Sequence, residues 1–338
     1  MYFKAAILED KNKVSIRYLK KPIKINNGHV LVKIFYSSLC HTQLQEIEGK
    51  RGKDRFLPHC LGHEGVGQVE KIYKNCKKFK VGDFVCLSWV KSENTKTGGF
   101  IYDDNSGKKI NSGPVHTLNQ YSVIDESRIY KLKDKKKIKN KVLLGCALPT
   151  VFNIFMENKN MKKNDKICVL GGGGLGLSFI MIANQLGYKN LTLLDKNKNK
   201  LKVIKKSINK IKCYNDLKAI PNTENFDIVV ECTGNLDVLE YSSLLARKFG
   251  GKIIVVGNYT KGKSINLDPW NIIEGITYQG AWNSDINFKN KFKKLLNIFN
   301  KLDTEIFFSK KIYNISEINK AIKDFKSGKV IRPLIRMT

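Results

Sequence analysis

The sequence predicts an α/β protein in which a mainly β half precedes a doubly wound parallel sheet. Its 338 residues fit one large domain or two of ordinary size. Short apolar runs alternate with turn residues up to about residue 146. From residue 166 onward, continuously apolar runs alternate with helical segments, as in a parallel sheet covered on both faces.

The first half contains short segments typical of strands. They are 30–36, 65–72 and 83–87. Gly82 and Asp83 predict a tight turn before the last of these strands. Residues 91–113 are rich in Gly, Ser, Asn and Lys and show neither a helical nor a strand period. A loop is therefore expected there.

In the second half, four short and fully apolar segments are expected to be strands. They are 167–170, 191–194, 226–230 and 252–256. A helix is expected at 177–186, closed by Gly187. Near the C-terminus, residues 315–325 have the period of an amphipathic helix, with Ser316 as its N-cap and Gly328 as its stop.

A glycine run indicates a dinucleotide-binding turn between a strand and a helix. Gly171, Gly173 and Gly176 fit the G-x-G-x-x-G pattern. The first permits a tight turn, the second lets the backbone approach a pyrophosphate, and the third allows the helix to pack closely on the strand. With Gly174 and Leu175 the run also opens the helix whose N-terminus receives the anion.

An acidic residue at the end of the next strand bears on the choice of dinucleotide. Asp195 lies 19 residues after Gly176 and is expected to accept hydrogen bonds from the adenosine ribose. A carboxylate there would repel a 2′-phosphate, which favours NAD over NADP. Lys196, Lys198 and Lys200 weaken this preference, because a basic neighbour could tolerate the phosphate. Lys200 is accordingly counted among the candidate cofactor-binding residues.

Two cysteines and a histidine are candidate ligands of a catalytic metal. Cys40 and Cys146 offer thiolates, and His63 offers an imidazole. Zinc held by such a set keeps one coordination position open for a reacting molecule. Spacing alone is weak support, since a buried cysteine is more often a small core residue than a ligand.

The segments around these residues resemble the zinc-containing medium-chain alcohol dehydrogenases, in order and over essentially the full length. The matching segments are 38–42, 61–67, 81–85, 144–150 and the glycine run with Asp195. The resemblance implies a GroES-like β-barrel catalytic domain over 1–146 and 286–338, and a Rossmann NAD-binding domain over 147–285. It also implies one Zn²⁺ per chain, NAD as the cofactor, and hydride transfer between an alcohol and an aldehyde or ketone.

The resemblance implies roles around the metal. Cys40, His63 and Cys146 match the three zinc ligands. Glu64 matches an acid that lies near the metal and tunes it. Thr42 matches the hydroxyl that hydrogen-bonds the substrate oxygen and passes its proton on.

Three further matches concern the cofactor and the pocket. His41 matches a contact to the cofactor pyrophosphate, and Thr150 matches a residue near the nicotinamide. Trp89 matches a position that lines the substrate pocket, where a large ring would narrow it. Trp89 can equally be a plain core aromatic.

The chain departs from the family in three places. Residues 91–120 contain no cysteine, so the second, structural zinc site of many relatives is expected to be absent. Gln45 occupies the position of a histidine that ends the proton relay in many relatives, and Val151 replaces the usual glycine. These changes put ethanol-type specificity in doubt but leave hydride transfer intact.

Two other functions are compatible with parts of the sequence. One is a polyol or sugar-alcohol dehydrogenase of the same superfamily, against which Cys146 argues, because that branch often uses Glu as third ligand. The other is a basic nucleic-acid-binding protein on a Rossmann scaffold, suggested by a formal net charge of +31. The lysines are scattered among Asn and Ile without an arginine-rich arm, so no nucleic-acid partner is expected. The positive field would still concentrate anionic ligands such as the cofactor.

Composition also bears on compartment and assembly. The eight cysteines form no CxxC pair and do not resemble a disulfide framework. No apolar run approaches the roughly 18 residues of a membrane span, and the first residues lack a signal-peptide pattern. A cytoplasmic protein is expected. The resemblance implies a homo-oligomer, a dimer or a tetramer, with a small alcohol or carbonyl compound as its substrate.

Overall fold

The chain divides into two compact units. The computed structural model describes residues 1–90, 98–208, 210–221, 225–282 and 288–338. The first unit comprises 1–149, 284–296 and 308–338, and the second comprises 150–283 and 297–307. The domain boundary expected between residues 285 and 286 lies outside the described residues and stays a prediction.

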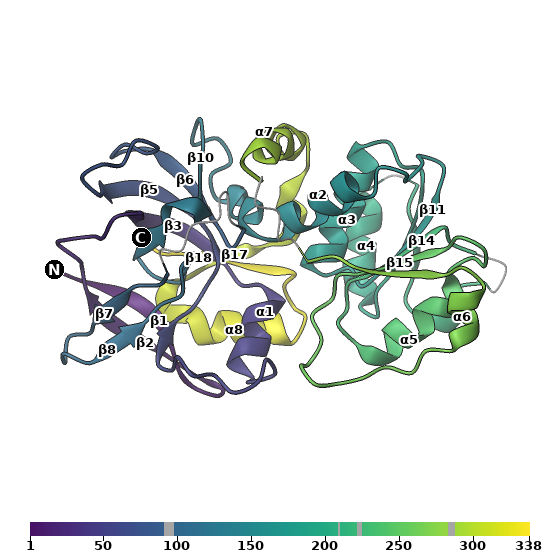
Figure 1. Ribbon diagram of the computed structural model, residues 1–338, viewed down its shortest axis with the longest axis horizontal. Helices are drawn as coiled ribbons and strands as arrows, with labels where there is room; N and C mark the ends of the chain where they lie inside the picture. Colours follow the sequence, from purple (N-terminus) through teal and green to yellow (C-terminus); the bar gives the residue numbers. More distant parts are fainter. Residues whose placement is uncertain (91–97, 209, 222–224, 283–287) are drawn as a thin grey trace. The chain divides into compact units, whose positions relative to one another are not determined.

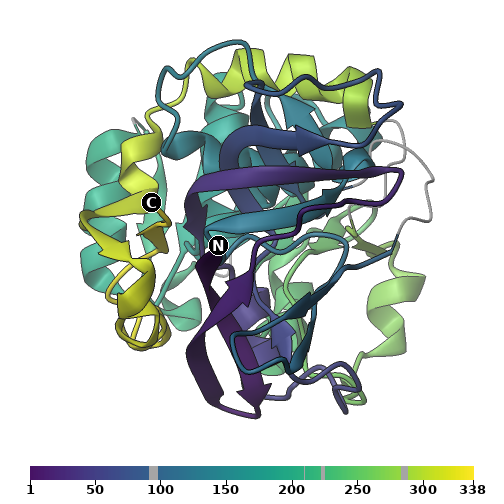
Figure 2. The same ribbon diagram turned by 90° about the vertical axis from the view of Figure 1, so that its left-hand side faces the viewer.

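The first unit contains a five-stranded sheet in the order β2-β1-β4-β8-β7. Its strands are β1 (Tyr2–Asp10), β2 (Lys13–Lys20), β4 (His59–Cys60), β7 (Ile101–Asp103) and β8 (Lys109–Asn111). The β1–β2 hairpin is the purple pair near the N-terminus in Figure 2. Phe3, Ala5 and Ile7 alternate along β1 and are buried in one apolar cluster.

A second sheet of seven strands follows the order β10-β6-β5-β3-β18-β17, with β9 also paired to β3. Its strands are β3 (His29–Ser38), β5 (Glu64–Ile72), β6 (Phe84–Ser88), β9 (Tyr121–Asp125), β10 (Ile129–Lys131), β17 (Phe308–Asn314) and β18 (Arg332–Arg336). The strands predicted at 30–36, 65–72 and 83–87 are thus confirmed. Because β18 pairs antiparallel with β3, the end of the chain completes a sheet begun near its start.

The prediction of an unstructured loop over 91–113 was wrong for part of that segment. Residues 91–97 lie outside the described residues, but β7 and β8 form an antiparallel pair. Tyr102 and Ile110 face each other in this pair and are almost fully buried. Each strand holds three residues, too few to give a periodic signal in the sequence.

Short helices connect the strands of the first unit. They are α1 (His41–Ile47), α8 (Ile318–Lys326) and the 3₁₀ turns η1 (Glu126–Arg128), η2 (Asn140–Gly145) and η5 (Ile315–Glu317). Ser316 was expected to cap α8, but it lies inside η5. Asn314 and Glu317 form a capping box at the start of η5, in which the Glu317 carboxylate accepts a hydrogen bond from the Asn314 backbone N–H, and Glu317 is in turn the N-cap residue of α8. Gly328, with φ of 72°, follows the end of α8 as predicted.

The second unit is built on a six-stranded, fully parallel sheet in the order β13-β12-β11-β14-β15-β16. Its strands are β11 (Lys166–Leu170), β12 (Asn190–Leu194), β13 (Lys212–Tyr214), β14 (Ile228–Glu231), β15 (Lys252–Val255) and β16 (Thr277–Gly280). Its helices are α2 (Ala147–Glu157), α3 (Gly174–Gln185), α4 (Lys198–Ser207), α5 (Leu236–Leu245), α6 (Pro269–Ile273), η3 (Leu217–Ala219) and η4 (Thr304–Phe307). Both α2 and α7 (Phe288–Phe299) have residues in each unit.

The strand order reverses between β11 and β14. The chain moves outward in one direction from β11 and in the other from β14, and α3 and α5 pack along these strands (Figure 1). Right-handed crossovers then place α3 and α5 on opposite faces of the sheet. A ligand crevice is expected at such a reversal, outside the carboxyl ends of the strands. Within the described residues, no helix has both the length and the apolar composition that crossing a bilayer requires.

Candidate active site

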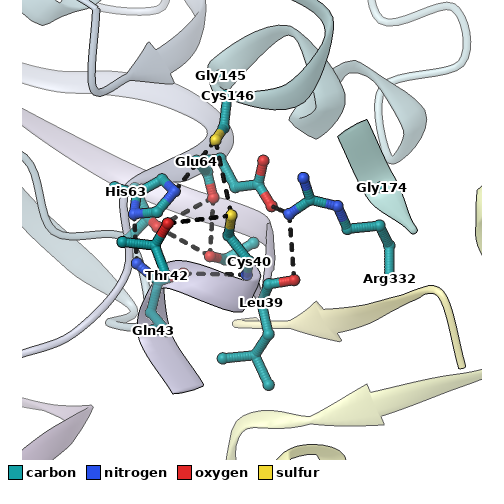
Figure 3. Close-up of polar contacts among 12 residues, drawn as sticks. Leu39, Cys40, Thr42, Gln43, His63, Glu64, Gly145, Cys146, Gly174 and Arg332 are labelled. Atoms are coloured by element: carbon teal, nitrogen blue, oxygen red, sulfur yellow. Dashed lines mark hydrogen bonds and ion pairs between the residues drawn. The ribbon is translucent and has the colours of Figure 1, made fainter. Parts of the chain in front are cut away.

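Three separate segments of the first unit bring two thiols and an imidazole together. Cys40 is the N-cap of α1, His63 lies between β4 and β5, and Cys146 joins η2 to α2. His63 Nε2 lies 3.3 Å from Cys146 Sγ, and the two sulfur atoms are 3.8 Å apart (Figure 3). All three donor atoms lie within 4.8 Å of one another. This Cys₂His set fits a Zn²⁺ ion with one open coordination position.

A glycine allows the Cys146 segment to approach the strands that carry the rest of the site. A Cβ on Gly145 would lie 2.5 Å from the Leu87 carbonyl oxygen and 2.8 Å from Glu64 Cα. Any other residue at this position would therefore push Cys146 away from His63. The Ser88 hydroxyl and the Trp89 backbone N–H both donate to the Gly145 carbonyl, at 2.7 and 3.3 Å, and fix the segment further.

The three candidate ligands shift one another's pKa values. The Cys146 thiol donates to Cys40 Sγ, which lowers the pKa of Cys40 well below its usual range and raises that of Cys146. Burial lowers the pKa of His63, but the neighbouring Cys40 thiolate outweighs it and the net shift is upward. The shift favours the thiolate form of Cys40, which is the form that binds a metal.

Sequence reasoning missed Gln43, which touches two of the three candidate ligands. Its Oε1 accepts a hydrogen bond from the Cys40 backbone N–H at 3.0 Å, and its Nε2 contacts His63 Nδ1. An amide NH₂ can only donate, so in this arrangement Nδ1 accepts and the ring proton is on Nε2. A signal was available: Gln at the third position after a helix N-cap often bonds back to the cap.

Sequence reasoning also missed Arg332, the partner of Glu64. Arg332 Nη1 donates to Glu64 Oε1 at 2.7 Å and to the Leu39 carbonyl at 3.2 Å. Both side chains are almost fully buried, at 2% and 0% exposure. Burial raises the pKa of the Glu64 carboxyl to about 7, although Arg332 opposes this shift. Because Arg332 lies on β18, no local pattern in the sequence links it to Glu64.

Two of the remaining residues predicted near the metal or the cofactor, Thr42 and His41, lie on α1, and Trp89 lies directly after β6. The Cys40 thiol lies 3.7 Å from the Thr42 hydroxyl oxygen, so Thr42 borders the candidate metal position. His41 is the first residue of α1, and its ring is 6.0 Å from that of Phe325. Trp89 follows β6 and is half-buried beside the Cys146 segment.

The glycine run occupies the turn between β11 and α3, as its spacing predicts. Gly171 has φ of 96°, and a Cβ on Gly176 would lie 1.8 Å from the Gly171 carbonyl oxygen. Gly173 is the N-cap of α3, and a Cβ there would meet nothing within 4 Å. Gly174 and Leu175 open the helix. The turn therefore offers free backbone N–H groups beside an open space, a suitable cradle for an anion.

Asp195, directly after β12, is held by three hydrogen bonds. Its Oδ2 accepts from the Gly172 backbone N–H at 2.8 Å and from Lys200 Nζ at 2.7 Å, and its Oδ1 accepts from the Asn197 N–H at 2.9 Å. Of the three lysines considered with it, Lys200 is the one that pairs with the carboxylate, whereas Lys196 and Lys198 are exposed. Thr150 is buried in the first turns of α2.

Comparison with known proteins yields two family matches. Residues 26–134 match the alcohol dehydrogenase GroES-like domain, and residues 174–301 match the zinc-binding dehydrogenase domain. The chain is 26% identical over 346 residues to S-(hydroxymethyl)glutathione dehydrogenase of Komagataella pastoris, covering 91% of this chain and 90% of that protein.

Solved structures agree with this assignment of the fold. Benzyl alcohol dehydrogenase from Acinetobacter calcoaceticus superposes with a TM-score of 0.86 at 23% identity, covering all of both chains. An alcohol dehydrogenase zinc-binding domain protein from Burkholderia ambifaria gives 0.85 at 20% identity, covering 100% of this chain and 99% of that one. The predicted fold class, a GroES-like domain joined to a Rossmann domain, is confirmed.

Proposed function

Because the chain belongs to the zinc-containing medium-chain alcohol dehydrogenase family, we propose that Cys40, His63 and Cys146 hold its catalytic zinc. Members of this family are oxidoreductases that act on CH–OH groups with zinc and a nicotinamide dinucleotide. The observation that carries the assignment is the convergence of two thiols and an imidazole within 4.8 Å, with the pKa of Cys40 lowered by its neighbour Cys146.

When bound, zinc supplies a Lewis acid that lowers the pKa of an alcohol, and the nicotinamide ring accepts the hydride. The protein's own residues position and neutralise the reactants. The Thr42 hydroxyl, beside Cys40, would accept a hydrogen bond from the alcohol, orient its oxygen and pass the proton on by giving up its own. The Glu64 carboxylate, held by Arg332, places a buried negative charge next to His63 and adjusts how strongly the thiolate and imidazole donors hold the metal.

We assign the nucleotide to the turn after β11, with NAD rather than NADP as the preferred cofactor. The open space at Gly173 and the N-terminus of α3 suit the pyrophosphate. Asp195 would accept from the adenosine ribose, and its negative charge disfavours a 2′-phosphate. Its pairing with Lys200 reduces this discrimination without removing it, because a 2′-phosphate would have to displace the carboxylate from the lysine.

The substrate is proposed to be a small alcohol or its aldehyde or ketone. The relatives named above act on benzyl alcohol and on S-(hydroxymethyl)glutathione by their names, so primary alcohols lead the list to test. We place the protein in the cytoplasm as a homo-oligomer. Exposed aromatic and aliphatic side chains on the second unit, Trp270, Ile273 and Trp282, provide apolar surface that a second copy would cover.

The deciding experiment removes one ligand and follows metal and activity together. In Cys146→Ala, zinc measured by atomic emission should fall from about one per chain to near zero. Reduction of NAD and of NADP should be lost in parallel on a panel of primary, secondary and sugar alcohols. Cys86→Ala is the matched control, because Cys86 is also fully buried in the first unit but lies outside the ligand set. Unchanged zinc and activity in Cys146→Ala would contradict the assignment.

A further inference from the structure

An alcohol dehydrogenase must release one proton to solvent for each hydride that it transfers, and the position expected to end this route carries an amide. Gln45 lies in α1, three residues after Thr42, and an amide does not titrate near neutral pH. If the proposed function holds, the proton from Thr42 must leave through water or another titratable group. The residues that surround α1 provide one.

Glu46 lies four residues after Thr42 in α1, so the two side chains are on the same face of this helix. The Cβ atoms of such a pair are about 5–6 Å apart, a separation that one water molecule spans. The Glu46 side chain is only 26% exposed, and burial raises the pKa of its carboxyl. A raised pKa makes the carboxylate a stronger base, which favours its acceptance of a proton during turnover.

His59, on β4, links Glu46 with a second carboxylate, Asp54. His59 Nε2 lies 3.9 Å from Glu46 Oε1 and 2.8 Å from Asp54 Oδ2. Its Nδ1 donates to the Cys60 carbonyl at 2.9 Å, which fixes the ring and leaves Nε2 as the atom that exchanges a proton. The His59 side chain is 9% exposed and those of Glu46 and Asp54 are 26% and 25% exposed, so a covered imidazole lies between two carboxyl groups that both reach water.

We propose that Glu46, His59 and Asp54 form the proton exit of this enzyme. Thr42 receives the alcohol proton while its own hydroxyl proton passes through a water molecule to the Glu46 carboxylate. Glu46 hands the proton to His59 Nε2 after a small side-chain rotation that closes the 3.9 Å gap. His59 then delivers it to Asp54, which releases it to bulk water. One proton leaves per hydride, so no further reactant is needed.

The charged groups around Glu46 set the pH range of this exit. His59 faces it from β4, His63 from the segment before β5, and Arg51 and Asp54 from the residues that follow α1. His59, His63 and Arg51 favour the ionised carboxylate, whereas burial and Asp54 favour the neutral acid. Removing the Glu46 carboxyl therefore removes a group that can change its charge during turnover without removing a metal ligand.

The test compares Glu46→Gln and His59→Ala with a matched control, Glu48→Gln. Glu48 belongs to the same end of α1 but forms ion pairs with Lys50 and Lys326. Stopped-flow recording of an indicator dye would follow proton release, and absorbance would follow NADH. In both relay variants, kcat at neutral pH should fall at least roughly 10-fold and proton release should lag behind NADH formation. The control should behave as wild type, and zinc content should stay at one per chain in all.

Rescue distinguishes a proton-transfer role from a merely structural one. Added imidazole should restore kcat in His59→Ala, because a small base can occupy the space and carry the proton. Loss of zinc or of folding in Glu46→Gln would contradict the proposed proton exit. An unaltered kcat and pH profile in both relay variants would also contradict it. If His59→Ala did not fold, the kcat and proton release of Glu46→Gln would still test the proposed proton exit. A wild-type protein inactive on every alcohol would instead overturn the proposed function, and the proton exit with it.

Discussion

At the scale of single residues, the Gln43 amide and the His63 imidazole make conflicting demands on one proton. A histidine that binds zinc through Nε2 carries its proton on Nδ1 and donates it to a neighbouring acceptor. Here Nδ1 meets the NH₂ group of Gln43, while the amide oxygen is engaged by the Cys40 N–H. Zinc binding through Nε2 therefore requires the Gln43 amide to rotate by about 180°, and this rotation breaks its hydrogen bond with the Cys40 N–H.

Replacing this amide by a carboxylate of the same length should strengthen zinc binding. In Gln43→Glu, one oxygen accepts from Cys40 N–H and the other accepts from His63 Nδ1–H, so no group has to turn. The zinc affinity should rise roughly 10-fold, as measured by competition with a chromophoric chelator. Gln68→Glu adds the same charge to β5 outside the site and should leave the affinity unchanged. Equal affinities for Gln43→Glu and wild type would show that the amide reorients without cost.

Some residues of the site could be predicted from the sequence, and one could not. The three candidate ligands, Glu64 and Thr42 all lie in short segments that could be recognised locally. Arg332 could not be, because it meets Glu64 only through the pairing of β18 with β3 across nearly the whole chain. A buried carboxylate without this partner would face a large desolvation cost, so the pair is a condition of the site rather than a detail.

At the scale of elements, the short β7–β8 pair is supported by a buried histidine that the sequence did not single out. The Tyr102 hydroxyl donates to His116 Nε2 at 2.8 Å, and His116 Nδ1 donates to the Gly113 carbonyl at 3.2 Å. The same hydroxyl accepts from the Val123 N–H of β9. Burial lowers the pKa of His116 to about 3, so the ring stays neutral in the folded protein.

This histidine should make stability fall with acidification. The unfolded chain takes up a proton near pH 6.5 and the folded chain does so only near pH 3, so unfolding is favoured progressively as the pH falls through this range. The difference in unfolding free energy between wild type and His116→Gln should shrink by roughly 1.4 kcal/mol per pH unit below pH 6.5. Urea unfolding at several pH values with a chelator present measures it. Parallel stability curves for the two proteins would contradict a neutral, buried His116.

Some strands and helices could be predicted from their own sequence and others could not. β11, β12, β14 and β15 contain apolar runs that are largely buried, and all four were predicted. The short edge strands β13 and β16 were not, because their residues are only half-buried and lack an apolar run. The helix expected from residue 315 begins as the 3₁₀ turn η5, which Asn314 rather than Ser316 caps, and α8 follows from Ile318.

At the scale of the whole molecule, the formal charge of +31 acts through its field rather than through a single patch. NAD is anionic and most candidate alcohols are neutral. Raising NaCl from about 0.05 to about 0.5 M shortens the Debye length to a few ångströms and should raise KM for NAD at least about twofold. KM for an uncharged alcohol should change little and is the internal control. Equal salt responses of the two constants would mean that the field does not reach the nucleotide site.

The sequence by itself determined the two halves of the chain, the glycine turn with Asp195, and the identity of the three candidate metal ligands. These features are local, because periodicity, turn chemistry and ligand type are properties of short segments. The tertiary structure alone decided that Cys40, His63 and Cys146 converge, that Arg332 pairs with Glu64, and that His59 of β4 lies near Glu46 of α1. Those relations depend on strand pairing between segments far apart in the chain, and no local pattern specifies which strands will be neighbours.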